Sequence, residues 1–216
     1  MTKKREFQIW ESISDIMTGL MMVFLFISLA FLFELKMETS GYAEIKQQIY
    51  VDLCNEFEED ELNQWGAEIN RDTTAIYFKS PDIHFGKGDS NPSPKFQTIL
   101  KDFFPRYIAV LNQEKYQGKI AEIRIEGHAS REWKGDPNSD EAYFYNMKLS
   151  QERARNVLQY LFRLPEVKDE KEWLRDTMTA NGYSYSHAGE DNDFAKRVEF
   201  RIVTEAENKL KVMFSD

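Results

Sequence analysis

One long apolar run stands out in a chain whose other positions are largely polar. Residues 16–33 carry no formal charge, and only Thr18, Gly19 and Ser28 interrupt the apolar pattern. At about 1.5 Å per residue, a helix of this run spans about 27 Å, close to the thickness of a bilayer's hydrocarbon core. The pattern therefore predicts a transmembrane helix over residues 12–33.

The flanks of this helix predict its orientation. Lys3, Lys4 and Arg5 precede it, and the positive-inside rule keeps that end in the cytoplasm. Residues 1–11 are then a cytoplasmic tail. The chain from residue 34 onward lies across the membrane, in the periplasm if the source is a Gram-negative bacterium. We therefore expect a single-pass protein of the bacterial inner membrane.

A cleaved secretory signal is the alternative to an anchor. The apolar region of such a signal is shorter, and a small-residue cleavage site follows it. Here the run leads into "FELKMETSGYAEIKQQIY", which contains no A-x-A pattern. An uncleaved anchor therefore fits the sequence better.

Beyond the anchor, apolar residues at steps of three and four predict that the helix continues to about residue 62. We assign residues 34–69 to a helical linker, which is a plausible dimer-stabilising element. The acidic run between Asp52 and Glu61 favours a solvated helix face over a metal site, because nothing spaces the ligands. Cys54, the single cysteine, fits an unreactive thiol or an intermolecular disulfide across a dimer axis.

Strand and helix patterns alternate over residues 70–206, which we expect to form one folded domain before a C-terminal tail of residues 207–216. Alternating apolar residues predict strands at 73–80, 119–130 and 197–204, and helical spacing predicts helices at 95–113, 149–162 and 169–178. We expect Pro105 to kink or divide the first of these helices and Ser150 to cap the second. Interleaved strands and helices indicate an α+β fold with helices on one face of a sheet.

Composition narrows the function. The net charge of −9 argues against a nucleic-acid partner, because phosphate neutralisation needs a basic surface. His84, His128 and His187 are scattered through the chain, and no H-E-x-x-H or Cys/His ligand spacing is present. "GHAS" lacks the second glycine of a nucleophile elbow. We therefore expect neither a hydrolytic enzyme nor a cofactor, and interpret His128 as a strand-end histidine with satisfied hydrogen bonds.

Four blocks of the folded region, in order, resemble the OmpA-like peptidoglycan-binding family. They are "IHFGKGDSNPSPKFQTIL", "IRIEGHAS", "YNMKLSQERARNVLQYL" and "AKRVEFRI", which are similar to the family's first strand-to-helix segment, its G-H-T-D strand end, its Y-N-x-x-L-S-x-x-R-A helix and its N-R-R-V-E closing strand. The resemblance implies a βαβαβ sandwich domain that binds peptidoglycan.

The same resemblance implies a set of binding residues. In the family, the helix arginine and the aspartate of G-H-T-D clamp a diaminopimelate unit, a charge-complementary pair for a zwitterion. The positions that match or adjoin the family's motifs are Tyr145, Asn146, Leu149, Arg153, Arg197 and Ser130.

The chain departs from the family at three of the motif positions. Ala129 and Ser130 stand where the family has Thr and Asp, and Ala195 replaces the asparagine of the closing strand. The partner for a ligand ammonium is thereby lost, unless the inserted "REWKGDPNSDEA" supplies Glu132 or Asp136. We therefore expect peptidoglycan binding with altered or weaker chemistry.

The anchor carries a second resemblance. "SDIMTGLMMVFLF" is similar to the D-x-M-T-x-x-M start of the transmembrane helix in MotB-type stator subunits, whose aspartate carries the transported ion. Asp15 occupies that position, with Ser12 and Thr18 on the same helical face. By position alone, Asp15 could equally cap the helix and interact with its dipole. The resemblance favours the role of ion carrier for Asp15. This role also agrees with the rule that an intramembrane carboxylate normally faces protein or water.

The two resemblances together imply a tethered motor subunit. Its partners would be a pentameric A subunit of the MotA or ZorA type, a second copy of this chain, and peptidoglycan. The anchor with the G-H-A-S loop and Trp133 looks most like the MotB-like subunit of Zorya anti-phage defence systems. A flagellar-type stator subunit and a passive peptidoglycan anchor stay as alternatives, and these residues do not distinguish protons from sodium ions.

Overall fold

The computed structural model describes residues 2–79, 84–86, 88–131, 136, 138–186 and 196–213, and within the first helix it places the side chains of residues 10, 13–34, 36 and 44–56. The chain divides into two units, residues 1–43 and 44–216, which are considered separately below. Trp133, Ala195, His187 and Glu132 of the sequence predictions lie outside the described residues.

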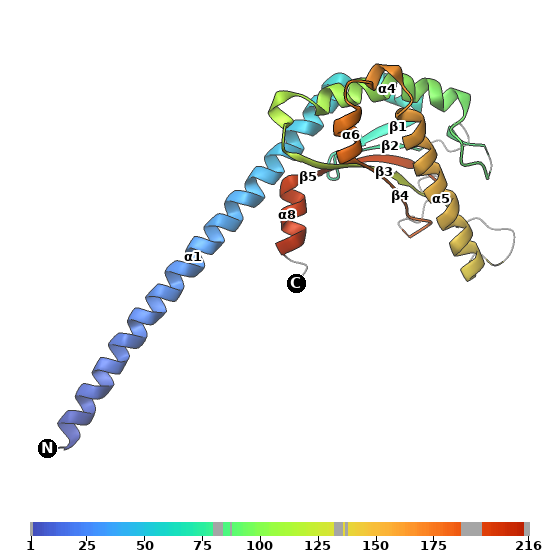
Figure 1. Ribbon diagram of the computed structural model, residues 1–216. Coiled ribbons are helices and arrows are strands. Elements are labelled where there is room, and N and C mark those ends of the chain that lie inside the picture. The colour runs from blue at the N-terminus through green and yellow to red at the C-terminus, as the bar shows by residue number, and fades with distance from the viewer. Residues whose placement is uncertain are drawn as a thin grey trace. The chain divides into compact units, whose positions relative to one another are not determined.

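The first unit is helical. The helix α1 runs over Thr2–Glu56 and so continues into the second unit (Figure 1). Its segment Ile13–Glu34 has a mean hydropathy of 2.5 and is long and apolar enough to cross a membrane. Every side chain of this segment is exposed, as expected of a surface whose partners are lipid or another chain.

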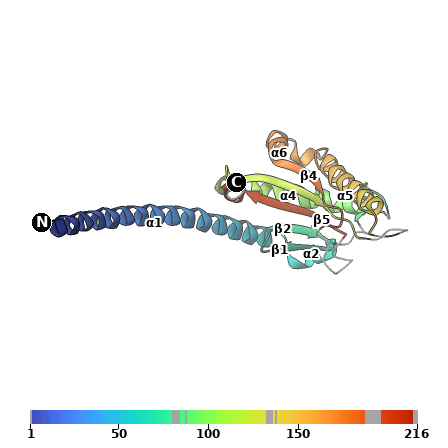
Figure 2. The same ribbon diagram turned by 90° about the horizontal axis from the view of Figure 1, so that it is seen from below.

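The second unit is built on one five-stranded sheet in the order β1-β2-β5-β3-β4. Its strands are β1 (Ala67–Asn70), β2 (Ala75–Phe78), β3 (Ile120–Gly127), β4 (Met178–Gly182) and β5 (Val198–Thr204). Only β3 and β4 pair in parallel, and the connection between them contains α5. The last strand, β5, inserts between β2 and β3 and is antiparallel to both. Figure 2 shows β2 and β5 side by side.

Helices cover one face of this sheet (Figure 1). They are α4 (Pro94–Leu111), α5 (Asp140–Leu161) and α6 (Lys171–Thr177). The short α2 (Glu59–Trp65) precedes β1, and α8 (Glu205–Met213) follows β5 directly. The expected α+β architecture with a single N-terminal apolar helix is confirmed.

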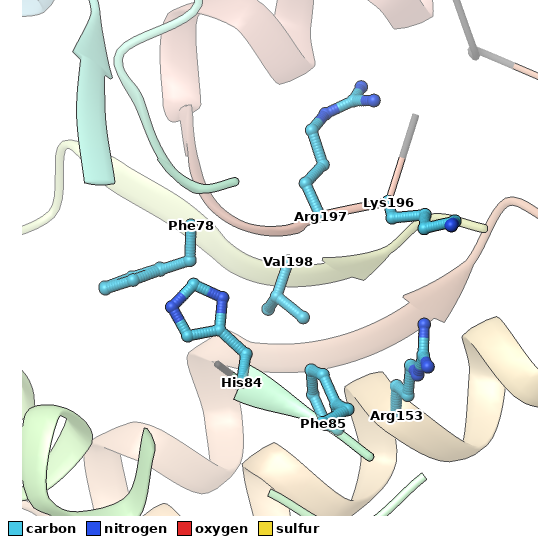
Figure 3. A pocket seen from close by; sticks show the side chains of 7 residues that line it. All are labelled: Phe78, His84, Phe85, Arg153, Lys196, Arg197 and Val198. Carbon is cyan, nitrogen blue, oxygen red and sulfur yellow. The ribbon is translucent and has the colours of Figure 1, made fainter. Parts of the chain in front are cut away.

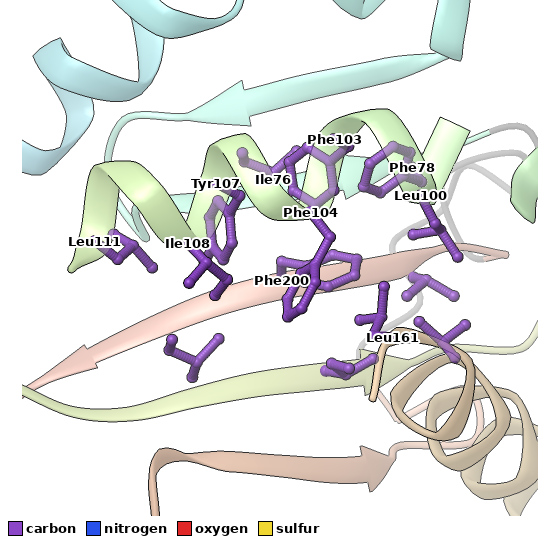
Figure 4. Packing of buried hydrophobic residues seen from close by; sticks show 14 of the residues in the cluster. Ile76, Phe78, Leu100, Phe103, Phe104, Tyr107, Ile108, Leu111, Leu161 and Phe200 are labelled. Carbon is purple, nitrogen blue, oxygen red and sulfur yellow. The ribbon is translucent and has the colours of Figure 1, made fainter. Parts of the chain in front are cut away.

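The core between helices and sheet is rich in aromatic rings. Phe200 of β5 packs against Phe103 of α4 at 5.1 Å between ring centroids, and against Phe78 of β2 at 5.8 Å. Figure 4 shows rings from α4 directed at Phe200. Most of these pairs meet edge to face, the arrangement that aromatic quadrupoles favour. The core thus joins α4 to the central strand of the sheet.

The end of α1 belongs to the folded unit. Ile49, Leu53 and Phe57 are at most 1% exposed and lie in the same core. Arg106 of α4 donates through Nε to Glu56 and through Nη1 to Glu61, each at 2.7 Å. The compact unit therefore begins at Glu44, ahead of the domain start that we expect at residue 70.

This arrangement also changes the interpretation of the acidic run. Asp52 accepts a hydrogen bond from the hydroxyl of Tyr116 at 2.7 Å and pairs with Lys115. Glu56 and Glu61 bind Arg106. Only part of the run is the expected solvated face, because three of its carboxylates hold the helix end to the domain. Cys54 is exposed, and its pairing across a dimer stays a prediction.

The helices differ from expectation at three places. The helix from residue 34 stops at Glu56 rather than near 62, and α2 follows as a separate helix. Pro105 does not divide α4, which runs unbroken from Pro94 to Leu111, because apolar residues on both sides of the proline pack into one core. A helix also occupies most of the expected C-terminal tail.

The prediction that Ser150 caps a helix was wrong. The cap of α5 is Ser139, whose Oγ accepts from the Ala142 N–H at 3.2 Å, so the cap lies eleven residues before the expected one. Ser150 is fully buried within the helix. Its Oγ accepts from the N–H of Ser184 at 3.0 Å and ties the helix to the turn after β4. Strands β1 and β4, both too short for a clear alternation, escaped the sequence analysis.

Two glycines allow α5 to lie directly on the sheet. A Cβ at Gly127 would stand 2.2 Å from the carbonyl oxygen of Ser150, and one at Gly182 would stand 2.4 Å from the backbone nitrogen of Gln151. In both cases the clash is with backbone that cannot rotate away. The separation between α5 and the sheet therefore depends on glycine at these positions.

We predict that Gly127→Ala lowers the free energy of unfolding by about 2–3 kcal/mol, because α5 must shift off the sheet to admit the methyl group. Urea unfolding of the full chain in detergent, followed by circular dichroism, measures the loss. Gly86→Ala is the matched control, since a Cβ there meets its nearest atom at an ordinary 3.4 Å. Equal stability of the two variants would contradict the close-packing argument.

Candidate functional site

A small hollow lies where β5 begins, between β2 and α5. Figure 3 shows its lining, which consists of Phe78, His84, Phe85, Arg153, Lys196, Arg197 and Val198. Apolar and aromatic groups form one side of the hollow, and cationic residues come from α5 and from the segment entering β5. The lining residues therefore suit an anionic group more than a cationic one.

Arg153 is the most constrained of the cations. Its side chain is only 7% exposed, and its Nε donates to the backbone carbonyl of Asp89 at 3.0 Å. The guanidinium also lies 4.8 Å from the ring centroid of Phe85. Burial lowers the pKa of Arg153, while the nearby Asp89 and Tyr145 act in the opposite direction. A desolvated arginine of this kind is suited to binding an incoming carboxylate.

Arg197 differs from Arg153 in that its charge is balanced within the domain. Its Nε donates to the carboxylate of Glu199, and its guanidinium lies 5.7 Å from the ring centroid of Tyr77. Figure 3 shows the Arg197 side chain pointing away from Arg153. A contact between the Arg197 guanidinium and a ligand stays a prediction.

The loop before α4 is fastened to α5 beside the hollow. Nδ2 of Asn156 donates to the carbonyl of Ser90 at 3.1 Å, one turn beyond the Arg153 contact. Within the loop, the Asp89 carboxylate accepts from the Asn91 N–H at 2.9 Å, which together with further bonds holds the Asp89 pKa below its usual value. The loop that carries the Arg153 partner is thus ordered by side chains of α5.

The other predicted binding residues do not line the hollow. Tyr145 is 45% exposed, and its hydroxyl lies next to Gly88. Leu149 is half-buried, and Ser130 is buried. Asn146 is buried, and its Nδ2 has no hydrogen-bond partner among the described residues. Of the six predicted residues, the structure brings only Arg153 and Arg197 into one hollow.

Asp136, one of the two acidic residues suggested above as a partner for a ligand ammonium, forms hydrogen bonds within its own turn. The Asp136 carboxylate accepts from the N–H of Asn138 at 2.9 Å, and its backbone carbonyl accepts from the Ser139 hydroxyl at 2.8 Å. These bonds form the turn that starts α5. Asp136 is therefore used in helix capping rather than directed at the hollow by any described contact.

The sequence analysis missed the residues of the loop that form the aromatic side of the hollow. His84, Phe85 and Asp89 lie in a segment whose glycines and prolines indicate only a turn. The signal that could have identified them is their position in a strand-to-helix block that resembles the OmpA-like family. Lys196 follows Ala195 in the closing block and could have been found in the same way.

Asp15 lies in the first unit, on an exposed helix surface. The Thr18 hydroxyl, one turn further, donates to the backbone carbonyl of Ser14 at 2.8 Å. At Gly19 a Cβ would meet nothing within 4 Å, so this face is open to close approach by another helix. The side chain of Ser12 lies outside the described residues.

Comparisons with known proteins give two related sequences. The Zorya protein ZorB of Escherichia coli (Crooks strain) is 42% identical over 227 residues, spanning 99% of this chain and 95% of the relative. A Zorya protein ZorB of a second Escherichia coli strain is 25% identical over 205 residues, spanning 89% of this chain and 79% of the relative. No model of a protein family matches the chain.

Among solved structures, a MotB-like protein from Desulfovibrio vulgaris is similar with a TM-score of 0.51 and 20% sequence identity. The match covers 77% of this chain and 95% of that structure. At this level of identity the likeness concerns the fold alone.

The buried His84, which lines the hollow, leads us to predict how the stability of the domain depends on pH. It is 1% exposed, and burial lowers its pKa from 6.5 to about 4. Between these two pH values the unfolded chain binds a proton that the folded chain does not. We therefore expect His84 to make the free energy of unfolding fall by up to about 3 kcal/mol as the pH drops from 6.5 to 4.

Chemical unfolding at a series of pH values measures this dependence. The comparison variant is His84→Phe, which keeps a ring between Phe78 and Phe96 but cannot titrate. Carboxylates titrate in the same window in both proteins, so the difference between the two slopes isolates His84. Identical slopes would exclude a depressed pKa at this position.

Proposed function

The chain belongs to the ZorB family of Zorya proteins, and we propose that it is the MotB-like subunit of an inner-membrane motor tethered to the cell wall and serving anti-phage defence. The observation that carries this proposal is the 42% identity to a ZorB protein across 99% of the chain. The apolar N-terminal helix and the mixed sheet domain agree with it. In this arrangement α1 anchors the chain once in the membrane, with the domain in the periplasm.

Asp15 is the proposed ion carrier. A carboxylate near the start of an apolar helix is costly in lipid, which favours a position against protein or water. Uptake and release of a proton by Asp15 would change the charge on the helix. The open surface at Gly19 and the hydroxyl of Thr18 lie within one turn, where a partner helix could approach.

A partner follows from the exposed surface of the anchor. No side chain of Ile13–Glu34 is buried within the chain, and a single helix cannot enclose a path for ions. We propose that a pentameric A subunit of the ZorA type surrounds two copies of this helix. Protonation of Asp15 then alters contacts between the helices and drives the ring around the tethered pair.

The hollow at Arg153 is the proposed contact with peptidoglycan. Arg153 is buried and fixed by the carbonyl of Asp89, and Lys196 is close by in the lining. A carboxylate of a peptide stem would form charge-assisted hydrogen bonds there. The position of the family's G-H-T-D aspartate is occupied by Ser130, so we propose that recognition of the ligand ammonium is weaker or is supplied elsewhere.

Asp15→Asn tests the motor. The amide is close in size to the carboxyl but cannot carry a proton, so we expect loss of phage protection in a plaque assay with normal protein level and unchanged wall binding. The system is expressed with its partner genes for this measurement. Unchanged protection by Asp15→Asn would favour the passive anchor.

Arg153→Ala tests the wall contact. We expect recovery of the full chain with purified sacculi to fall by about tenfold or more, because a charged hydrogen-bond donor is lost from the site. Arg155→Ala is the matched control, since Arg155 lies on the same helix and is exposed. Equal recovery of wild type, Arg153→Ala and Arg155→Ala would exclude this hollow as the binding site.

A further inference from the structure

Three metal-ligating side chains lie together on the face of the sheet opposite the aromatic core. Glu126 is near the end of β3, His128 follows that strand, and Glu199 belongs to β5. One ligand atom from each side chain lies within 4.8 Å of the others. All three residues are buried, with at most 5% of their surface exposed. Neither the wall contact nor the ion carrier makes use of this cluster.

The separations within the cluster approach those of a metal site. Nε2 of His128 is 3.3 Å from Oε1 of Glu199 and 3.9 Å from Oε2 of Glu126. Zinc bonds to nitrogen and oxygen of about 2.0–2.1 Å in tetrahedral geometry place neighbouring ligand atoms about 3.3 Å apart. His128 and Glu199 thus already have this spacing, and Glu126 would have to move closer for the three atoms to surround one ion.

Two carboxylates of the cluster face each other across the sheet. Glu126 and Glu199 are direct partners across the antiparallel pair of β3 and β5, where like charges destabilise a sheet. Burial increases that cost, and burial is also the main cause of a raised pKa at Glu199. Arg197 bonds to Glu199, and Arg201 and Arg124 also interact electrostatically with Glu199 and Glu126, so the repulsion is partly compensated within the domain.

Surrounding groups hold the ligands in place. The hydroxyl of Tyr183 donates to Oε1 of Glu126 at 3.4 Å, which leaves Oε2 directed at His128. The rings of Tyr183 and His128 stack with centroids 5.3 Å apart and planes within 8° of parallel. The backbone N–H of His128 donates to the carbonyl of Arg197 at 2.9 Å. Such outer contacts orient the ligands of metal sites.

We propose that Glu126, His128 and Glu199 form a binding site for a divalent transition metal ion, with zinc as the best fit. The mixed nitrogen and oxygen donors suit zinc better than calcium or magnesium, which prefer oxygen alone. The ion joins β3 to β5 at the strand ends that also position Arg197. Three protein ligands leave the fourth position of a tetrahedral ion to a water molecule or to the second oxygen of a carboxylate. The proposal does not depend on wall binding or on ion transport.

Zinc binding to the full chain, purified in detergent without a histidine tag and stripped with a chelator, tests the site. We expect one zinc ion per chain by metal analysis and a higher melting temperature in zinc. Cobalt in place of zinc should give the visible absorption of a tetrahedral site. Because the site is buried, the metal is added both to the folded protein and during refolding.

Glu126→Gln is the main variant, and we expect its zinc affinity to fall by at least about tenfold. It should fold well, because it removes one charge from a buried like-charge pair, so without metal its melting temperature should equal or exceed that of wild type. Glu122→Gln is the matched control, from the same strand four residues away, and should bind zinc like wild type. His128→Gln provides a second loss of a ligand.

Two results would overturn the proposal. One is wild-type protein that takes up no stoichiometric zinc by either route, in which case a proton on His128 balances the carboxylates instead. The other is zinc binding that is unchanged in both Glu126→Gln and His128→Gln, which would assign the bound metal to other residues. Wall binding and phage protection are separate assays, so either result leaves the proposed function to be judged independently.

Discussion

The packing of Phe200 against the rings of α4 is the contact on which the rest of the domain depends. Phe200 is fully buried at the centre of the aromatic cluster, in the strand that lies between β2 and β3. Its inward direction sets the direction of every other side chain in β5, because successive residues of a strand point to opposite faces. Val198 and Ile202 therefore join the core, and Glu199 and Arg201 are placed on the other face.

This alternation connects stability with the candidate sites. A slip of β5 by one residue would exchange its two faces, which would bury Glu199 among aromatic rings and remove Arg197 from the hollow. The rings of the core thus position charged groups that they do not touch. Close approach of α5, allowed by Gly127 and Gly182, has the same effect for Arg153, whose reach to the Asp89 carbonyl depends on the height of the helix above the sheet.

Patterns of local sequence predicted the parts of the structure that depend on neighbours in the chain. The apolar run, the strands at β2, β3 and β5 and the helices α4 to α6 all follow from periodicity within short windows. Errors arose where distant residues decide. Ser150 has the side-chain chemistry of a helix cap, but its hydroxyl oxygen accepts a hydrogen bond from Ser184 instead. Pro105 is accommodated because the residues on both sides of it pack into the same core. Strand β4 depends on pairing with β3, far earlier in the chain, whereas β1 pairs with the adjacent β2 and was missed because it has only four residues.

The sequence by itself determined the class of the protein: an apolar helix followed by a mixed domain, with an OmpA-like order of motifs and a MotB-like aspartate. The tertiary structure decided which charges are available. Arg153 and Arg197 look alike in the sequence, yet Arg153 bonds to a backbone carbonyl and Arg197 to the carboxylate of Glu199. Glu126, His128 and Glu199 are separated by up to a third of the chain and form a cluster only because β5 inserts beside β3. Charge interactions depend on distance and burial in space, which local patterns do not contain.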